Sequence, residues 1–557
     1  MFFLSGKGCS EFPKRMLISI GILIIYYTLS RKQGVRRPHR NRENIRSTVI
    51  RMEQDLTESQ EIRQSGKQEA IMKMKKFAAM MLAGVLATTT MGMGVSASDD
   101  DYDFYFFNIK GEDADAMQAA VDAYKEETGV TIKLFTLGSG TDSSEALRAD
   151  LQSDHMPAIF GVQDAQRLVE YQEGGYAMPL SDATNEDFKA LADAIPENFY
   201  LTRDGETNYG VPLNIEGYGY IVDTRVIGAM FGEDNTDAFI EAYKTASYAE
   251  FEAMINAMQQ YITDGTADDI TLSGSTFSFA EKNDITSKLK GVIAVAGSEK
   301  WTYGDHLVNV AVDGVFSDSV AAAEATTEQL EAGKPVWEAY AKLLDLLTSH
   351  AQTERGPELI NQTTNGYDQA VASFANGETV FIKQGNWCYT NITNANADIA
   401  DYMTFLPIKL DVTDEDLTSG ITAEQMNTSI PVFVPQYYCI NAKCSDEEKE
   451  AAEKFLVWLN TSETGMKYVI EECSFIPYNA DPDVISAGYS LGDSILSYVK
   501  EGKTITNAYA GMPASYATFT LGAHLLENYV NTAEWPETAY SDIADFIVSS
   551  WSEAAGL

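Results

Sequence analysis

The fold is decided by the stretch from residue 102 to residue 162, which opens with Tyr102-Asp103-Phe104-Tyr105-Phe106-Phe107. This aromatic run predicts a buried strand. The apolar spacing from Ala116 to Tyr124 then predicts a helix that ends near Gly129. The pattern continues with a strand over 130–135, a helix over 144–153 and a strand over 157–162.

Strands that alternate with helices in this way imply parallel pairing in an open α/β sheet. Ligands of such sheets bind at the carboxyl ends of the strands. The loops 108–111 and 161–164, which follow the first and third strands, are therefore the expected binding loops.

Length and net charge limit the number of domains and the kinds of partner that the chain can have. It has 557 residues, enough for at least two domains, and 45% of them are hydrophobic, which is typical of globular proteins. Acidic residues outnumber basic residues by 82 to 40, for a formal net charge of −42. A surface this negative repels nucleic acid and anionic lipid, so we expect neither as a partner.

The first 97 residues differ in charge from the rest, with 16 basic and 7 acidic residues against 24 and 75. Residues 73–97 carry the parts of a secretory signal: basic Lys73 to Lys76, an uncharged stretch, and Val95-Ser96-Ala97 before an acidic run. We therefore expect export and a mature chain that begins at Ser98. No cysteine follows the apolar segment, so no lipoprotein attachment site is expected there.

Because a signal peptide belongs at the start of a chain, we expect translation to begin at Met72 or Met74 and residues 1–72 to be a non-native or disordered extension. The alternative keeps this extension, in which residues 16–29 form an apolar run. That run is shorter than the roughly 20 residues of a membrane span.

Residues beyond 225 read mainly as amphipathic helices, over 248–263, 335–348 and 446–459, the last running on to 464–471. Ser445 and Glu448 have the spacing of a capping box. Strand-like segments recur at 379–382, 403–408 and 431–440. Four cysteines lie after residue 98, and the sequence leaves open one bridge, such as Cys439 to Cys473, against isolated buried thiols.

Sequence motifs for nucleotide binding, serine hydrolysis and zinc proteolysis are missing, and no Cys/His spacing suits zinc. We therefore expect no metal, no cofactor and no enzyme activity. What remains is a mixture of aromatic and carboxylate or amide side chains on the loops. Sugars require this mixture, because flat aromatic faces stack on pyranose C–H surfaces while polar side chains bind the hydroxyls.

Four segments, in order, resemble the carbohydrate-binding group of extracellular solute-binding proteins of ABC importers, the group that includes maltose-binding protein. They are Met156–Asp164 with Tyr171–Leu180, Tyr209–Asp223, Phe374–Val380 with Gln384–Trp387, and Ile440–Lys443 through Trp458-Leu459 to Phe475-Ile476-Pro477. Together they cover roughly residues 101–480.

The resemblance implies a two-lobed periplasmic-binding-protein fold, type II-like, with a hinge between the lobes. Lobe 1 would comprise 98–214 plus 402–480, and lobe 2 would comprise 215–401 plus 481–557. The implied function is the capture of a sugar or oligosaccharide by lobe closure and its delivery to a membrane permease, by a monomer at the outer face of the cytoplasmic membrane.

The resemblance also implies ligand-binding residues. Trp387 matches the family's stacking tryptophan, Asp164 a hydroxyl-binding aspartate and Glu216 a carboxylate at the interlobe crossing. The alternatives are core packing for Trp387 and a cap or salt bridge for each carboxylate. Gly161 stands where maltose-binding protein has a tryptophan, which argues against maltose-type specificity. The other expected ligand residues are Asn108, Tyr218, Trp301 and Asn386.

Two rival functions remain open at this level. The first is a secreted glycoside hydrolase that uses Asp164 and Glu216 as its carboxylate pair, which would require a separation of about 5–10 Å. The second is a binding protein for a solute other than a sugar, such as a peptide. Among carbohydrates we expect a neutral one, because few basic residues lie near the expected binding loops.

Overall fold

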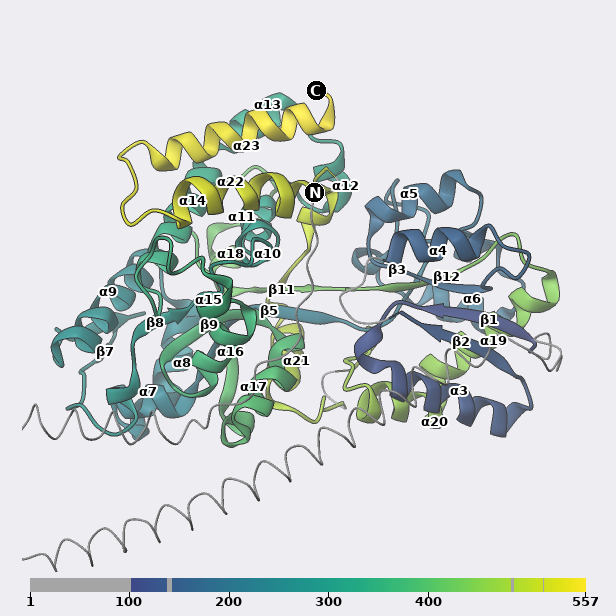
Figure 1. Ribbon diagram of the computed structural model, residues 1–557, viewed down its shortest axis with the longest axis horizontal. Coiled ribbons are helices and arrows are strands. Elements are labelled where there is room, and N and C mark those ends of the chain that lie inside the picture. The colour runs from purple at the N-terminus through teal and green to yellow at the C-terminus, as the bar shows by residue number, and fades with distance from the viewer. Residues whose placement is uncertain (1–101, 138–142, 482–484, 514) are drawn as a thin grey trace, which may run out of the picture. The chain divides into compact units, whose positions relative to one another are not determined.

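The computed structural model describes residues 102–137, 143–481, 485–513 and 515–557, all within one compact unit (Figure 1). The expected signal peptide and N-terminal extension lie outside the described residues. The first sheet has the strand order β2-β1-β3-β12-β4. Its strands are β1 (Phe104–Asn108), β2 (Ile132–Thr136), β3 (Ile159–Val162), β4 (Val211–Pro212) and β12 (Tyr437–Ile440).

Strands β1, β2 and β3 pair in parallel, as the alternating pattern predicts, whereas β12 is antiparallel to β3. Helix α3 (Ala114–Thr128) ends where Gly129 takes a positive φ of 80°, a conformation that glycine adopts without strain. The other main helices of this part are α4 (Ser143–Leu151), α5 (Ala165–Glu173), α6 (Glu186–Asp193), α19 (Asp446–Thr461) and α20 (Glu463–Lys467).

The capping box predicted for α19 is confirmed, since the Ser445 hydroxyl accepts from the Glu448 backbone and the Glu448 side chain accepts from the Ser445 backbone. The helical segment expected after α19 is less regular than predicted. Helix α20 leads into a π-helix, η8 (Tyr468–Glu472).

The second sheet has the order β13-β11-β5-β9-β8, and β10 also pairs with β5. Its strands are β5 (Glu216–Asp223), β8 (Gly291–Ala294), β9 (Thr379–Gly385), β10 (Met403–Leu406), β11 (Ile430–Phe433) and β13 (Thr504–Ile505), while β6 (Ile270–Leu272) and β7 (Ser275–Phe277) form a separate hairpin. We call the first sheet with its helices lobe 1 and the second sheet with its helices lobe 2.

The pairing corrects the expected lobe boundary at residue 402. Strands β10 and β11 are antiparallel to β5, so residues 403–433 belong with the second sheet rather than with lobe 1. The segment 431–440, expected to be one strand, is split into β11 and β12, which lie in different sheets. Pairing partners are set by long-range hydrogen bonds, so the local pattern of residues does not reveal them.

The chain thus passes between the sheets first from β4 to β5 and then from β11 to β12. Figure 1 shows β5 and β11 side by side at the passage, in keeping with the pairs Val432–Gly217 and Phe433–Glu216. The expected crossing over 209–223 is therefore present. Residues 434–436, between β11 and β12, form the return connection.

Helices cover both faces of the second sheet. The expected helices over 248–263 and 335–348 are confirmed as α9 (Tyr248–Asp264) and α14 (Lys334–Ser349). The others include α7 (Thr224–Phe231), α8 (Thr236–Thr245), α10 (Trp301–Gly304), α11 (His306–Val315), α12 (Ser319–Ala323), α13 (Thr327–Ala332), α16 (Tyr367–Ala375), α17 (Tyr389–Ala395), α18 (Ala423–Thr428), α21 (Ser490–Glu501) and α23 (Ala539–Ala555).

Two clusters of buried apolar side chains form the core. One packs on one face of the second sheet and includes Tyr218, Tyr220 and Val222 of β5. The other fills lobe 1 and continues onto the opposite face of the second sheet, where it takes Ile221. Because successive side chains of a strand point to opposite faces, β5 contributes to both clusters. Apolar packing therefore continues across the passage between the lobes.

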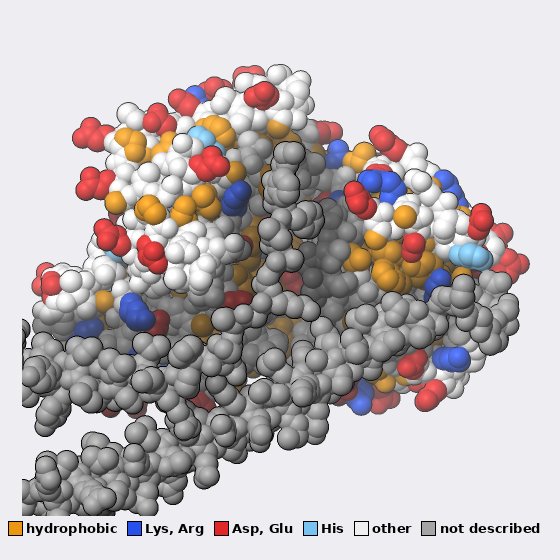
Figure 2. Space-filling model, viewed as in Figure 1, with side chains coloured by type: hydrophobic (Ala, Val, Ile, Leu, Met, Phe, Trp, Pro, Cys, Tyr) orange, Lys and Arg blue, Asp and Glu red, His pale blue; other side chains and the backbone are white. Residues whose placement is uncertain are grey.

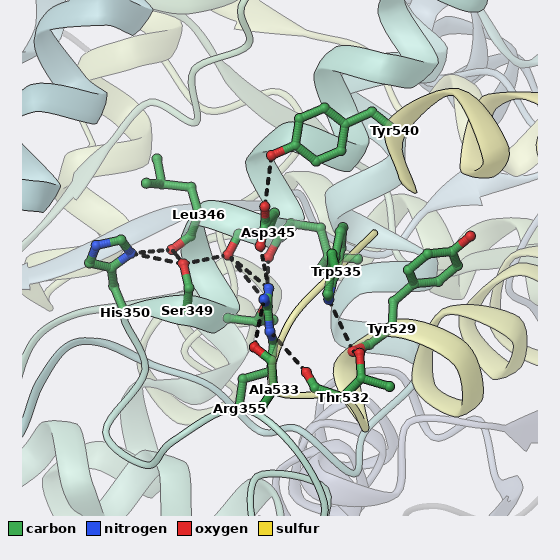
Figure 3. Close-up of polar contacts among 12 residues, drawn as sticks. Asp345, Leu346, Ser349, His350, Arg355, Tyr529, Thr532, Ala533, Trp535 and Tyr540 are labelled. Atoms are coloured by element: carbon green, nitrogen blue, oxygen red, sulfur yellow. Dashed lines mark hydrogen bonds and ion pairs between the residues drawn. The ribbon is translucent and has the colours of Figure 1, made fainter. Parts of the chain in front are cut away.

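Arg355 fastens the C-terminal segment to α14 (Figure 3). Its guanidinium donates to the Asp345 carboxylate and to the carbonyl oxygens of Thr532 (3.1 Å) and Ala533 (3.0 Å). The same group lies 4.9 Å from the centre of the Trp535 ring. A buried guanidinium with several charge-assisted partners anchors the chain that leads into α23.

The four described cysteines, Cys388, Cys439, Cys444 and Cys473, are free and buried. The bridge between Cys439 and Cys473 that the sequence left open is not formed, and isolated thiols are present instead. Burial raises the pKa of each thiol, to about 12 for Cys388, which keeps it protonated and unreactive.

Candidate ligand-binding cleft

A cavity of about 890 Å³ lies at the carboxyl end of β3 and is lined by residues of both lobes. Lobe 1 contributes 163–167, which confirms the expectation that the loop after the third strand faces a cleft. The end of β11 and the return connection contribute 432–435, and β12 contributes Tyr437. Lobe 2 also contributes 317–321 and parts of 506–519. Its volume lies in the range of about 300–1,000 Å³ that is typical of small-molecule sites.

The lobe 1 wall is the first turn of α5. The Asp164 carboxylate caps this helix by accepting from the Arg167 backbone N–H (2.9 Å), and it also pairs with the Arg167 guanidinium (2.5 Å). The next residues project across the cleft. The Gln166 side-chain amide donates to the carbonyl oxygens of Ala510 (3.0 Å) and Met512 in lobe 2. The two walls are thus joined directly by one side chain.

The lobe 2 wall carries three further carboxylates, of which Asp318 and Asp305 have hydrogen-bond partners within the wall. Asp318 caps α12 by accepting from the Ala321 backbone N–H at 2.8 Å. Asp305 accepts from the Thr518 hydroxyl at 2.6 Å, which ties the start of α11 to the 516–522 segment. Burial raises the pKa of Asp305 to about 6, since removal from water disfavours the charged carboxylate.

Aromatic rings form much of the remaining lining. Phe433 ends β11, Tyr437 begins β12, and Tyr509 lies in the 3-10 helix η9 (Ala508–Gly511). Tyr516 and Phe519 come from the π-helix η10 (Tyr516–Gly522). Rings and carboxylates therefore face the same cavity from several elements.

The cavity is acidic. Among the described residues that line it, five carry carboxylates and Arg167 alone carries a cationic side chain, which is already paired with Asp164. Acidic side chains are also scattered over the described outer surface on the face shown in Figure 2. The five acidic lining residues are Asp164, Glu197, Asp305, Asp318 and Glu324.

Of the seven ligand residues expected from the sequence, Asp164 lines this cavity and the other six do not. Glu216 lies at the start of β5, and its carboxylate pairs with the Lys110 ammonium at 3.1 Å, both side chains being buried. Asn108 is buried at the end of β1, where its side-chain oxygen accepts from the Lys110 backbone N–H at 3.2 Å. In this structure Asp164 caps a helix and Glu216 forms a salt bridge, which are the alternatives to ligand binding that the sequence left open.

Asn386 braces the crossing between the lobes. Its side-chain oxygen accepts from the Gly217 backbone at 3.0 Å, and its amide donates to the Tyr489 hydroxyl at 3.0 Å. Tyr218, the next residue of β5 after Gly217, is fully buried. These polar contacts hold β5 to the end of β9.

Trp387, Trp301, Tyr218 and Phe433 gather around one histidine. The His306 ring lies 4.8 Å from the ring of Trp387, 4.9 Å from Tyr218, 5.7 Å from Trp301 and 6.1 Å from Phe433, centre to centre. Three of the residues expected from the sequence therefore belong to one aromatic cluster. The rings of this cluster that line the cavity are Phe433 and Tyr509, the latter 6.1 Å from the His306 ring. Direct contact of Trp387 with a ligand stays a prediction.

Four aromatic residues that line the cavity were not predicted from the sequence: Phe433, Tyr509, Tyr516 and Phe519. Residues 504–530 have little regular α-helix, so no 3.6-residue apolar period marks them. The sequence feature that could have indicated them is the concentration of three aromatic residues within 509–519.

Among the described residues, no cluster of three or more histidine, cysteine or acidic side chains could hold a metal ion. Within the same residues, no helix is both long and apolar enough to cross a membrane.

Two α/β lobes, joined by strands that pass between them and enclosing a cavity lined from both, define the class of two-lobed solute-binding proteins. The chain belongs to the family of bacterial extracellular solute-binding proteins, which its residues 119–483 match. The resemblance and the fold class inferred from the sequence are thereby confirmed. This family consists of binding proteins that act outside the cell, and not of enzymes.

Solved structures share the fold. A family 1 extracellular solute-binding protein from Bifidobacterium longum subsp. infantis is 18% identical, with 81% of this chain and 98% of that chain covered and a TM-score of 0.52. Apo RafE from Streptococcus pneumoniae is 15% identical, over 81% and 97%, with a TM-score of 0.55. The GacH receptor of Streptomyces glaucescens is 13% identical, over 81% and 98%, with a TM-score of 0.52. No curated protein matches the sequence.

Proposed function

We propose that this protein captures a neutral sugar or oligosaccharide in the cleft and delivers it to an ABC transporter permease. The observation that carries the proposal is the lining of the cavity, where aromatic rings and carboxylates converge from both lobes. Sugar-binding proteins of similar fold support it: RafE in complex with raffinose, a chitin oligosaccharide binding protein, and GacH in complex with acarbose.

The chemistry suits a carbohydrate. Ring faces of Phe433 and Tyr509 offer apolar surface to pyranose C–H groups, while carboxylates such as Asp318 and Glu324 accept hydrogen bonds from hydroxyls. Closure of the lobes excludes water from the cleft, and each of these hydrogen bonds is then stronger.

The charge of the lining favours a neutral ligand. A sulfated or carboxylated sugar would meet five carboxylates and one guanidinium that is already paired with Asp164. Desolvating an anion without a free counter-charge is strongly unfavourable. Neutral hydroxyls carry no such cost.

Binding without catalysis is also our proposal for this chain. The rival glycoside hydrolase would need Asp164 and Glu216 on either side of one scissile bond. Asp164 lines the cavity, but Glu216 does not, and it is buried against Lys110. The arrangement of the two carboxylates thus argues against this pair.

Delivery of the sugar to a permease requires that the protein be exported. We propose export by the signal at 73–97, a mature chain that starts at Ser98, and action as a monomer that docks on the permease with its lobes closed. N-terminal sequencing of the exported protein checks the cleavage site, and retention of residues 1–97 would refute it.

A thermal-shift screen tests the binding function. Bound ligand raises the unfolding midpoint according to its concentration relative to Kd, and the panel should hold neutral oligosaccharides, sulfated and carboxylated sugars, and short peptides. We expect stabilisation by a neutral saccharide, with no release of smaller sugars on prolonged incubation. Turnover of the saccharide would support the hydrolase, and stabilisation by peptides alone would support the other rival.

A further inference from the structure

Phe519 lines the cavity, yet its side chain is largely exposed to solvent. Its exposed fraction is 70%, the highest among the large hydrophobic residues of the described chain. The other members of that exposed set are Phe135, Ile285, Tyr402 and Leu557, and none of them lines the cavity. Because Phe519 also lines the cavity, its ring offers apolar surface to a ligand there.

The exposure of Phe519 does not come from a loose backbone. The residues around it are anchored: the Tyr516 hydroxyl contacts the Ser550 hydroxyl at 2.8 Å, the Thr518 hydroxyl donates to Asp305, and Leu521 is fully buried. The ring is therefore held outward by a fixed segment.

The segment η10 itself departs from regular structure. Ser515, directly before it, has a φ of 60°, in the left-handed region that non-glycine residues seldom adopt. The segment is a π-helix, a form that is found frequently at functional sites. It also packs closely on α10, since a Cβ on Gly304 would lie 2.3 Å from the Ala517 carbonyl oxygen. Backbone strain of this kind is retained where surrounding contacts impose it.

The cavity is lined by Phe433 at the end of β11, by Tyr437 at the start of β12 and by Phe519 of η10. At about 890 Å³ it lies near the upper end of the range for small-molecule sites and exceeds the size of a single pyranose ring. A cavity of this volume has room for several sugar units, and both Phe433 and Phe519 line it.

We infer that Phe519 forms an outer stacking subsite, so that the ligand is an oligosaccharide whose far end leaves the inner cavity and lies on this ring. The inference rests on the proposed function and adds a chain-length preference to it. Inner residues bind the first sugar units, and Phe519 contributes to the affinity of the longer ones alone.

Calorimetric titration with saccharides of increasing length tests the inference. The probes are gluco-, xylo- and chito-oligosaccharides of one to six units and the series galactose, raffinose and stachyose. Wild-type protein should bind the longer members of one series more tightly than the shortest member that binds. Phe519→Ala should lower the affinity for the longest member about tenfold, or about 1.4 kcal/mol, and leave that for the shortest within twofold.

Two variants serve as controls. Phe519→Tyr keeps the ring and should keep the length dependence. Phe135→Ala removes a ring that is 42% exposed on β2, away from the cavity, and should change no affinity. Because Phe519 is mostly exposed, its replacement should leave the unfolding midpoint of the free protein unchanged.

An equal loss of affinity at every length, or no loss at any length, would overturn the outer subsite while leaving sugar capture intact. Wild-type protein that binds only a monosaccharide would do the same. Binding of no saccharide at all would overturn the proposed function together with the inference.

Discussion

Replacing Trp387 and Phe433 separately by alanine distinguishes core packing from ligand stacking within one aromatic cluster. The two rings are 6.4 Å apart, centre to centre, and both contact the ring of His306. Phe433 lines the cavity, whereas Trp387 does not. We therefore expect Trp387→Ala mainly to lower stability and Phe433→Ala mainly to lower ligand affinity.

For Trp387→Ala the main effect should be on stability. The indole packs against both hydrophobic clusters and its N–H donates to the Gln384 side chain at 3.1 Å. Complete burial would make the loss about 3–5 kcal/mol. Because this ring is only partly buried, we expect about 2–3 kcal/mol off the free energy of unfolding, and a change in affinity of about threefold or less.

For Phe433→Ala the main effect should be on affinity. An aromatic ring that stacks on a sugar behaves as a binding hot spot and contributes about 2 kcal/mol. At about 1.4 kcal/mol per decade, its loss weakens binding roughly thirtyfold. Phe433 is half-buried at the end of β11, so the accompanying loss of stability should be smaller than that for Trp387→Ala.

Urea unfolding of the free variants gives the stability change, and calorimetry with the best saccharide of the screen gives the affinity change. The reasoning fails if folded Trp387→Ala keeps wild-type stability and loses thirtyfold in affinity while Phe433→Ala binds normally. That result would instead support Trp387 as the main stacking platform, as the sequence resemblance implies.

Three further predictions concern other parts of the structure. Gln166→Ala removes the hydrogen bonds to the carbonyl oxygens of Ala510 and Met512, which should stabilise the closed arrangement of the lobes by about 1 kcal/mol. The variant should therefore bind ligand about fivefold more weakly, and small-angle scattering should show a more open free protein. Unchanged scattering and affinity would contradict this prediction. Burial raises the pKa of Asp305 to about 6. Between about pH 4 and about pH 6 the folded protein therefore binds more protons than the unfolded chain. The free energy of unfolding should fall by about 3 kcal/mol in all as the pH rises through that window. Asp305→Asn should abolish this slope in urea unfolding, and an unaltered slope would assign it to another group. Arg355→Met should lower the free energy of unfolding by about 3–5 kcal/mol, because the Asp345 carboxylate loses its cationic partner and keeps only the Tyr540 hydroxyl, while two carbonyl oxygens lose a donor. Ligand affinity should be unchanged, and a large loss of affinity in the folded variant would refute this separation.

The sequence predicted well those elements whose signals are local. The strand from Phe104 to Asn108, the helix that ends at Gly129 and the capping box of Ser445 depend on neighbouring residues, and all are present. Parallel pairing followed from the alternation of strands and helices, because this order leaves few other arrangements.

The sequence predicted less well whatever depends on distant partners. Strands β10 and β11 were placed with the wrong lobe because their hydrogen-bonding partner, β5, lies about 180 residues or more earlier in the chain. Tyr509 and Phe519 were missed because 3-10 and π-helices lack a clear apolar period. The predicted Glu216 was found paired with Lys110, a partner 106 residues away that no local pattern reveals.

Calorimetric titration of the wild-type protein with the saccharide that stabilises it most tests the central claim most directly. Sugar capture in the cleft predicts saturable binding of one neutral saccharide per chain, with the injected sugar recovered intact and affinity lost in Phe433→Ala. Preferential binding of a sulfated or carboxylated sugar, or undiminished binding by a folded Phe433→Ala variant, would contradict the account.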